Sequence, residues 1–128
     1  MTYLMLNIAV TVLFVGFIIW KILPARGVKQ IRIEELHHLM EDEHVQLIDV
    51  RPQMKYQQYH IRDFKNIPLK EIKKQAAHLS KDKPVVTVCQ TGAQGNEACK
   101  RLKRRGFKQL ANVQGGISTW EPMRAVRK

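Results

Sequence analysis

The chain has 128 residues, 45% of them hydrophobic, and a formal net charge of +11 at pH 7. This length suits one globular domain, and its two cysteines are too few for the framework of a disulfide-rich secreted protein. The positive charge would suit nucleic-acid binding, but the sequence contains no nucleic-acid motif and we expect no such partner. His37, Glu41 and His44 have loosely metal-like spacing without a firm third ligand. We therefore expect no metal, and no cofactor.

The N-terminal segment is uncharged and long enough to cross a membrane. The first 20 residues carry no charged side chain, and residues 2–23 would form a helix of about 30 Å. A cleaved signal peptide is less consistent with the Met-Thr-Tyr start and with the exit at Lys21 and Pro24-Ala25-Arg26. A buried core helix would show one polar face, which is absent here. We predict a transmembrane anchor over residues 1–23 that contacts membrane lipid through residues 2–23.

Basic residues follow the apolar segment and none precedes it; they are Lys21, Arg26, Lys29 and Arg32. The positive-inside rule then predicts a single-pass membrane protein whose soluble part is cytoplasmic. All charged side chains lie in residues 21–128, so the soluble part would be attracted to an anionic leaflet. We predict a linker over residues 24–30, a globular domain over 31–124 and a tail over 125–128.

Within the soluble part, short apolar runs alternate with amphipathic segments. In chain order the pattern predicts a brief strand at 31–33, a helix at 34–40, a strand at 45–50, a helix at 52–59 and an extended segment at 64–68. It then predicts a helix at 69–79, a strand at 85–88, a helix at 96–105, a strand within 107–113 and a last helix from 116. Strands alternating with helices indicate a parallel sheet covered on both faces.

Ligands bind such sheets beyond the carboxyl ends of the strands, and Cys89 falls at one of these ends. It closes the apolar run 84–88 and opens a small-residue loop consisting of Gln90, Thr91, Gly92, Ala93, Gln94 and Gly95. Backbone N–H groups of such a loop, and the N-terminus of the helix behind it, favour a thiolate over a thiol. A lone cysteine here could be a structural core residue, but the loop that follows is unsuited to a core. We predict a reactive Cys89 and an anion-binding loop over residues 90–95.

Residues from about 31 to 122 resemble a single rhodanese domain. The matching segments are Leu47-Ile48-Asp49-Val50-Arg51, Tyr59-His60-Ile61, Asn66-Ile67-Pro68-Leu69, Val86-Thr87-Val88-Cys89-Gln90-Thr91-Gly92, and Asn112-Val113-Gln114-Gly115-Gly116 followed by Trp120. The resemblance implies a small α/β fold with a five-stranded, mostly parallel sheet. It also implies sulfurtransferase activity, in which a cysteine takes a sulfane sulfur, becomes a persulfide and passes the sulfur on.

By that likeness Cys89 is the catalytic persulfide carrier, and Asp49 and Arg51 form a structural pair that supports its loop. His60 matches a supporting position. The implied partners are a sulfur donor, which could be thiosulfate, a low-molecular-weight persulfide or a protein persulfide, and a thiol acceptor.

The chain departs from the family pattern in two places. The usual loop resembles Cys-Arg-x-Gly-x-Arg-Ser, whereas Gln90, Gln94 and Gly95 stand at the two arginines and the serine. A charged contact typically contributes about 1.5–3 kcal/mol, so we expect weak activity with the thiosulfate dianion. The usual Gly-His-Ile-x-Gly-Ala is also changed, with Tyr59 and Asp63 in place of the glycines. We therefore expect a different local backbone there.

Other functions remain open at this stage. Without the arginines, the domain could be a catalytically silent module that binds protein partners at the membrane. A cysteine-dependent phosphatase is disfavoured, because its dianion-clamping arginine would stand where this chain has Gly95. Cys99 could form a disulfide with Cys89, but its place on the inner face of a helix favours a core role.

Overall fold

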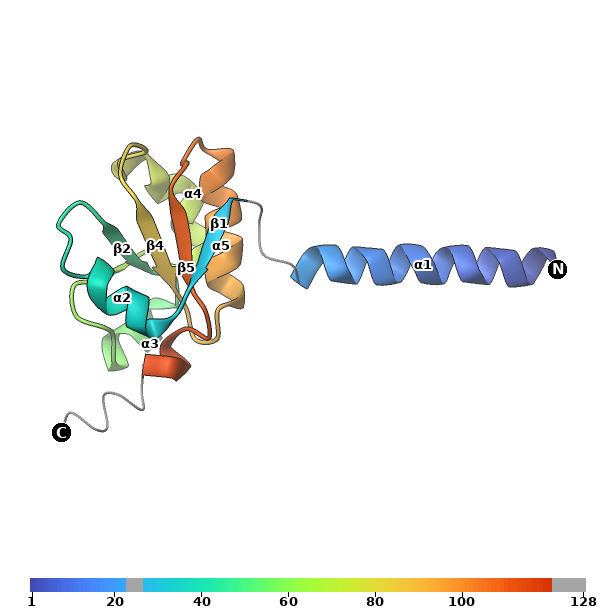
Figure 1. Cartoon of the computed structure of the whole chain (residues 1–128), viewed down its shortest axis with the longest axis horizontal. Helices are drawn as coiled ribbons and strands as arrows, with labels where there is room; N and C mark the ends of the chain where they lie inside the picture. The colour runs from blue at the N-terminus through green and yellow to red at the C-terminus, as the bar shows by residue number, and fades with distance from the viewer. Residues whose placement is uncertain (23–26, 121–128) are drawn as a thin grey trace.

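The computed structural model describes residues 1–22 and 27–120, and its first element is a long apolar helix, α1 (Thr2–Ile22) (Figure 1). In the described part of the chain, this is the one helix that is long and apolar enough to cross a membrane. Its side chains from Thr2 to Lys21 are exposed, and none of this span is buried against the rest of the protein. A membrane span and an N-terminal signal sequence share these properties.

The remaining described residues form an α/β domain around a five-stranded sheet. The strands are β1 (Val28–Ile31), β2 (Gln46–Asp49), β3 (Lys65–Asn66), β4 (Val85–Val88) and β5 (Leu110–Val113). Their order is β1-β5-β4-β2-β3, and every neighbouring pair is parallel. The predicted fold class, a parallel five-stranded sheet flanked by helices, is confirmed. The central strand β4 is buried at all four positions, as expected for a strand covered on both faces.

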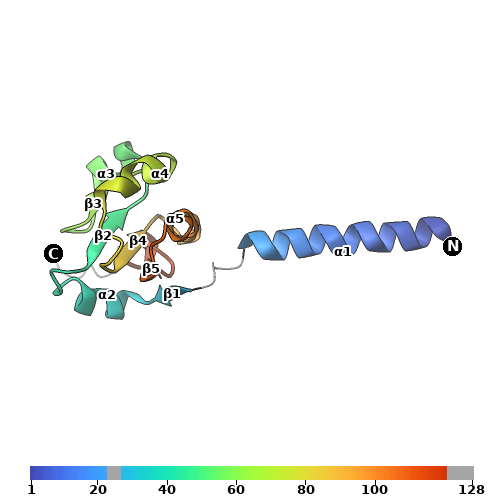
Figure 2. The same cartoon turned by 90° about the horizontal axis from the view of Figure 1, so that it is seen from above.

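Helices cover the two faces of the sheet (Figure 2). They are α2 (Ile33–Leu39), α3 (Gln53–Gln58), α4 (Ile72–Gln75) and α5 (Ala93–Arg104), with 3-10 turns η1 (Leu69–Glu71) and η2 (Ala76–His78). Residues 117–120 are also helical. Leu36 and Trp120 belong to the core cluster of one face, whereas Ile72 and Leu102 belong to that of the other. The parallel strands place all their carboxyl ends, including the end of β4, at one edge of the domain.

Three element boundaries differ from the sequence-based prediction. The first strand begins at Val28 rather than near residue 31, because Val28 pairs with Leu110 of the distant strand β5. The helix expected over 69–79 is divided between η1, α4 and η2; Arg101 Nη1 also donates to the Leu69 carbonyl at 3.1 Å. Helix α5 begins at Ala93 rather than 96, because Gly92, with φ of 110°, turns the chain into it.

Candidate active site

Cys89 lies directly after β4 and is 1% exposed. Its Sγ accepts a hydrogen bond from the backbone N–H of Gly92 at 2.9 Å. Its own carbonyl accepts the N–H of Ile117 at 2.8 Å, so the start of the last helix is fixed to the cysteine backbone. Gly116 makes this approach possible, because a Cβ there would overlap with the Cys89 carbonyl. The cysteine is thus held by main-chain groups of two separate segments, its sulfur by Gly92 and its carbonyl by Ile117.

The predicted loop 90–95 curls over this sulfur, but it is shorter than expected. Residues 90–92 form the loop, and residues 93–95 already belong to the first turn of α5. The exposed members are Gln90, Thr91, Ala93 and Gln94, whereas Gly92 and Gly95 are buried. A sulfur at this position faces the backbone of a turn and the amino end of a 12-residue helix, both of which favour negative charge.

A row of polar residues lies under the loop, with Thr87 and Asn112 buried and Gln30 half-buried, and the sequence did not predict it. Gln30, Asn112 and Thr87 are in register across β1, β5 and β4. Asn112 Nδ2 donates to the Gly92 carbonyl at 3.0 Å and to Gln30 Oε1 at 3.2 Å, and Thr87 Oγ1 donates to Asn112 Oδ1 at 3.1 Å. This row fixes the turn that carries the Gly92 N–H. The available sequence signal was a single polar residue inside each of the apolar strands β4 and β5, Thr87 and Asn112; in β1, Gln30 follows Lys29 and gives no such signal.

The polar row also explains the glycine at position 95. A Cβ on Gly95 would overlap with Asn112 Oδ1 and come within 3.2 Å of Thr87 Oγ1. The Gly95 carbonyl oxygen also lies 3.1 Å from Thr87 Oγ1, as an alternative acceptor for the single proton of that hydroxyl. A longer residue at this position, such as the arginine of a cysteine-dependent phosphatase, would therefore displace Asn112.

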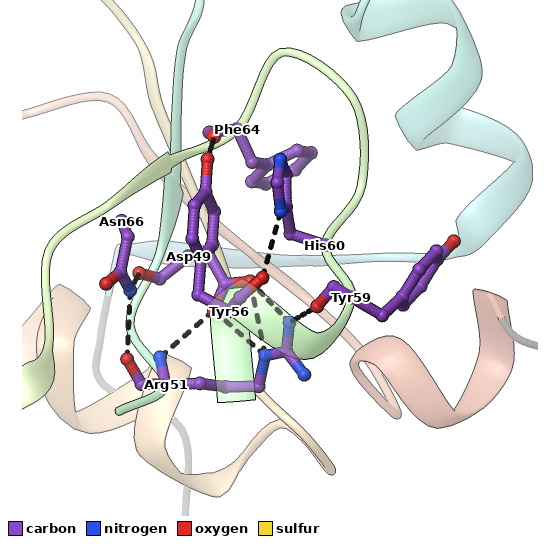
Figure 3. Close-up of polar contacts among 7 residues, drawn as sticks. All are labelled: Asp49, Arg51, Tyr56, Tyr59, His60, Phe64 and Asn66. Carbon is purple, nitrogen blue, oxygen red and sulfur yellow. Dashed lines mark hydrogen bonds and ion pairs between the residues drawn. The ribbon is translucent and has the colours of Figure 1, made fainter. Parts of the chain in front are cut away.

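Asp49 and Arg51 form a buried ion pair at the carboxyl end of β2 (Figure 3). Arg51 Nη2 donates to Asp49 Oδ2 at 2.9 Å and to the Tyr59 carbonyl at 2.6 Å. Asn66 Nδ2 donates to the Asp49 and Arg51 carbonyls at 3.0 and 2.9 Å. The pair therefore joins the end of β2 to β3 and to the segment after α3. Within residues 1–22 and 27–120, the polar contacts of the two side chains are with each other and with the Arg51 N–H and the Tyr59 carbonyl. Support of the loop by this pair therefore stays a prediction.

His60 lies on the outside of the segment that Arg51 anchors. It is exposed, stacks on Tyr56 with ring centroids 3.8 Å apart, and bonds to the Tyr56 carbonyl through Nδ1 at 2.9 Å. Tyr56 Oη donates in turn to the Phe64 carbonyl (Figure 3). Burial, with a smaller effect of the nearby Asp49 charge, raises the pKa of Tyr56. His60 therefore contacts Tyr56 within this segment, and its supporting role stays a prediction.

The backbone at one replaced glycine has a conformation that glycine adopts readily. Asp63 has φ of 71°, a left-handed value that aspartate tolerates better than most residues. The replacement at this position therefore does not exclude a positive φ, and the expected difference in backbone stays a prediction. At the other replaced glycine, Tyr59 has φ of −168°, which is ordinary extended backbone.

Cys99 lies inside α5 and is fully buried. Its Sγ is 3.2 Å from Thr87 Oγ1 and 3.7 Å from the Ala111 carbonyl. Burial, the largest effect, raises the pKa of Cys99 to about 11, so this thiol is protonated at neutral pH. The geometry agrees with the predicted core role.

A cavity of about 300 Å³ lies beside the loop, lined by Gln94, Val50, Pro52, Pro68, Leu69 and Lys70. Gln94 stands where the second loop arginine would be, and the exposed Lys70 is the basic residue in this lining. Within residues 1–22 and 27–120, no group of three histidine, cysteine or acidic side chains could hold a metal ion.

Fold and site together define a class of proteins: small parallel α/β domains with a cysteine loop between a central strand and a helix. Residues 32–122 match the rhodanese-like domain family, and the chain belongs to this family of sulfurtransferases.

Three comparisons describe its relatives. The chain is 34% identical to the uncharacterized protein YqhL of Bacillus subtilis, over 91% of this chain and 94% of that protein; so wide a match necessarily includes part of α1. It is 33% identical to a sulfurtransferase of Allochromatium vinosum, over 73% of this chain and 88% of the relative. The crystal structure of reduced CoADR-RHD from Bacillus anthracis aligns with a TM-score of 0.71 and 29% identity, over 79% of this chain but only 18% of that one.

Proposed function

We propose that the protein is a membrane-anchored sulfurtransferase that carries sulfane sulfur as a persulfide on Cys89. One observation supports this most directly: the Cys89 sulfur accepts the Gly92 N–H at 2.9 Å at the mouth of the loop. The α5 N-terminus and the backbone of residues 90–92 would hold a persulfide anion in the same way. The relative named as a sulfurtransferase matches over most of its own length, which agrees with a complete catalytic domain.

The proposed reaction consists of two displacements at sulfur. The Cys89 thiolate attacks the outer sulfur of the donor, forming a Cys89 S–S bond while the donor's own S–S bond breaks. With thiosulfate the leaving group is sulfite; with a persulfide it is the corresponding thiolate. An acceptor thiolate then attacks the outer sulfur of the Cys89 persulfide, takes that sulfur and releases the Cys89 thiolate.

The loop favours donors that carry little charge. Its exposed side chains are two glutamines, a threonine and an alanine, none of which can neutralise a dianion. A low-molecular-weight persulfide or a protein persulfide needs only the backbone donors. We therefore propose that these compounds are used in preference to thiosulfate.

Anchoring rests on α1, whose candidate membrane span, Thr2–Lys21, has 20 residues, a mean hydropathy of 2.2 and no buried portion. The basic residues after α1 support a cytoplasmic domain. The full chain should stay in the membrane pellet after alkaline carbonate extraction and leave it only with detergent. Release by carbonate alone would contradict the anchor and leave the Cys89 chemistry untouched.

A donor survey by intact mass spectrometry tests the sulfur chemistry. The detergent-solubilised chain is incubated with thiosulfate, with glutathione persulfide and with a protein persulfide. A gain of about 32 Da, one sulfur atom, is expected with the persulfides and is expected to be lost in Cys89→Ser. Cys99→Ala serves as the matched control and should gain the same mass. A chain that never gains sulfur on Cys89 would exclude the sulfurtransferase.

The catalytically silent module is the second candidate. The 1% exposure of Cys89 and the absence of loop cations favour it. If the protein only binds partners, a well-folded Cys89→Ser chain should fully replace the natural one in cells. A complete loss of the cellular phenotype in that variant would exclude the silent module.

A further inference from the structure

Exposed basic side chains gather where the chain enters β4 and β5. The entering segments, residues 81–84 and 103–109, contain one acidic residue, Asp82. Their exposed basic residues, which we call the basic end, are Lys81, Lys83, Lys103, Arg104, Arg105 and Lys108. So uneven a charge distribution produces a strong local positive potential.

The basic end is level with the first strand residue that follows the anchor. Val28 pairs with Leu110, and Leu110 pairs with Val85, so β1, β5 and β4 begin in one line. Figure 1 shows the α4–β4 and α5–β5 connections at the same end of the sheet as the start of β1. Lys103 Nζ also lies close to Gly27, 3.3 Å from where a Cβ on that glycine would be.

The covalent chain keeps this end close to the membrane. Only residues 23–26 separate the last residue of α1, Ile22, from Gly27. A fully extended chain covers at most about 3.6 Å per residue, so Gly27 lies within about 18 Å of the end of α1. Lys100 Nζ is 5.8 Å from the ring centroid of Trp20, near the end of α1. If α1 spans the bilayer, headgroups lie within reach of the basic end.

An apolar groove lies beside the same strands. It has a volume of about 550 Å³, and its lining includes Leu39, Pro84 and Leu110 together with Lys29, Glu35 and Lys108. Lys29 Nζ pairs with Glu35 Oε2 at 3.2 Å, so Lys108 and the basic end, rather than Lys29, would meet an anionic headgroup. An apolar floor bordered by Lys108 matches an amphipathic molecule that has an acyl chain and an anionic headgroup. Nucleic acid would use the basic residues but not the apolar groove.

These observations point to an anionic phospholipid as the partner of this surface. We propose that the basic end and its groove bind anionic phospholipid in the leaflet next to the anchor. The proposal rests on the anchor within the proposed function. Each basic residue near an anionic surface strengthens binding by about fivefold, so the group is sufficient to hold the domain against the leaflet.

Such docking would orient the active site. Cys89 follows the last residue of β4, at the opposite end from the basic end, and a four-residue strand is about 13 Å long. The loop would therefore be held away from the headgroups, where a cytoplasmic donor and acceptor can reach it.

Hydrogen exchange on the full chain in lipid nanodiscs tests the proposal. Phosphatidylcholine discs are compared with discs that contain phosphatidylglycerol. Phosphatidylglycerol should slow exchange at least about fivefold in residues 81–86 and 103–111, and leave residues 90–95 unchanged. The slowing should weaken as salt rises from 0.05 to 0.5 M. A phosphatidylglycerol with a photoreactive acyl chain should label peptides that contain Pro84 or Leu110.

Charge-matched variants decide the interpretation. Lys81→Gln, Arg104→Gln, Arg105→Gln and Lys108→Gln are combined in one chain, and Lys55→Gln, Lys65→Gln, Lys73→Gln and Lys74→Gln in the control. In the first variant, phosphatidylglycerol should no longer slow hydrogen exchange in residues 81–86 and 103–111. In the control variant, the slowing should remain. Equal exchange in both kinds of disc would overturn the proposal, as would protection of these segments by a single-stranded oligonucleotide but not by phosphatidylglycerol. Mass gain on Cys89 is independent of these outcomes, so the sulfurtransferase is tested separately.

Discussion

Cys89 and Cys99 are both almost completely buried, yet their surroundings differ in kind. Cys89 accepts a backbone N–H from Gly92 at the start of a helix. Cys99 lies in the middle of that helix, 3.2 Å from the Thr87 hydroxyl and 3.7 Å from a carbonyl oxygen to which it donates. The Cys89 sulfur accepts a main-chain N–H at a helix N-terminus, whereas the Cys99 sulfur donates to a carbonyl oxygen and contacts a hydroxyl that lowers its pKa less than burial raises it. Burial alone therefore does not distinguish a reactive cysteine from a structural one; the main-chain groups that face each sulfur do.

The largest expected effect is the loss of sulfur transfer when Cys89, but not Cys99, is substituted. Cys89→Ser should lower sulfur transfer at least about 1,000-fold, because the attacking nucleophile is lost. Cys99→Ala should keep transfer within a few-fold and destabilise the fold by about 1–2 kcal/mol through a small cavity. The activity is measured as steady-state sulfur transfer from glutathione persulfide. The stability is measured by urea unfolding. Comparable losses of activity in both variants would contradict the distinction.

Gly95 lies between Cys89 and Cys99 in the chain. A side chain added at this glycine should disturb the surroundings of both cysteines. Gly95→Ala should destabilise the fold by about 2–4 kcal/mol, because its Cβ overlaps with Asn112 Oδ1. In a double-mutant cycle, Asn112→Ala should remove most of this additional effect, since the overlapping atom is gone. Urea unfolding of the four chains measures the coupling. Additive losses would show that Asn112 is not the obstacle.

The raised pKa of Cys99 predicts a pH dependence of stability. The folded thiol, with a pKa of about 11, holds its proton where an unfolded cysteine, with a pKa near 8.5, has lost it. Its stabilising contribution is therefore complete below about pH 8.5 and is lost as pH rises toward 11, by roughly 3 kcal/mol. Urea unfolding between pH 8.5 and 11 measures the free energy of unfolding, which should fall less with pH in Cys99→Ala than in the natural chain. An identical fall in both chains would contradict the raised pKa of Cys99.

The smallest effect concerns the charge around Cys89. Gln94→Arg should improve kcat/KM for thiosulfate about tenfold, because a cation near the sulfur stabilises the dianion. The kcat/KM for glutathione persulfide should change little. Gln58→Arg, at an exposed position in α3, is the control for added surface charge. An equal gain for both donors would show that Gln94 does not set donor preference.

The sequence is sufficient for much of this description because the deciding signals are local. The apolar runs before Asp49 and Cys89 identify β2 and β4, and the small residues after Cys89 identify the loop. The local pattern does not locate the start of β1, since the polar residues Lys29 and Gln30 give no strong alternation and the pairing partner of the strand is some 80 residues away in the chain. The link between Gln30, Asn112 and Thr87 depends on register across three strands, which no local pattern contains.

The sequestration of Cys99 also bears on exposure of the protein to oxidants. A peroxide that converts Cys89 to a sulfenic acid leaves it in need of a second thiol to form a disulfide. The chain has two cysteines in all, and the other is buried and protonated, with a pKa of about 11. Recovery would therefore depend on a small thiol or a reductase from outside, and the damaged form would accumulate whenever that supply is exhausted.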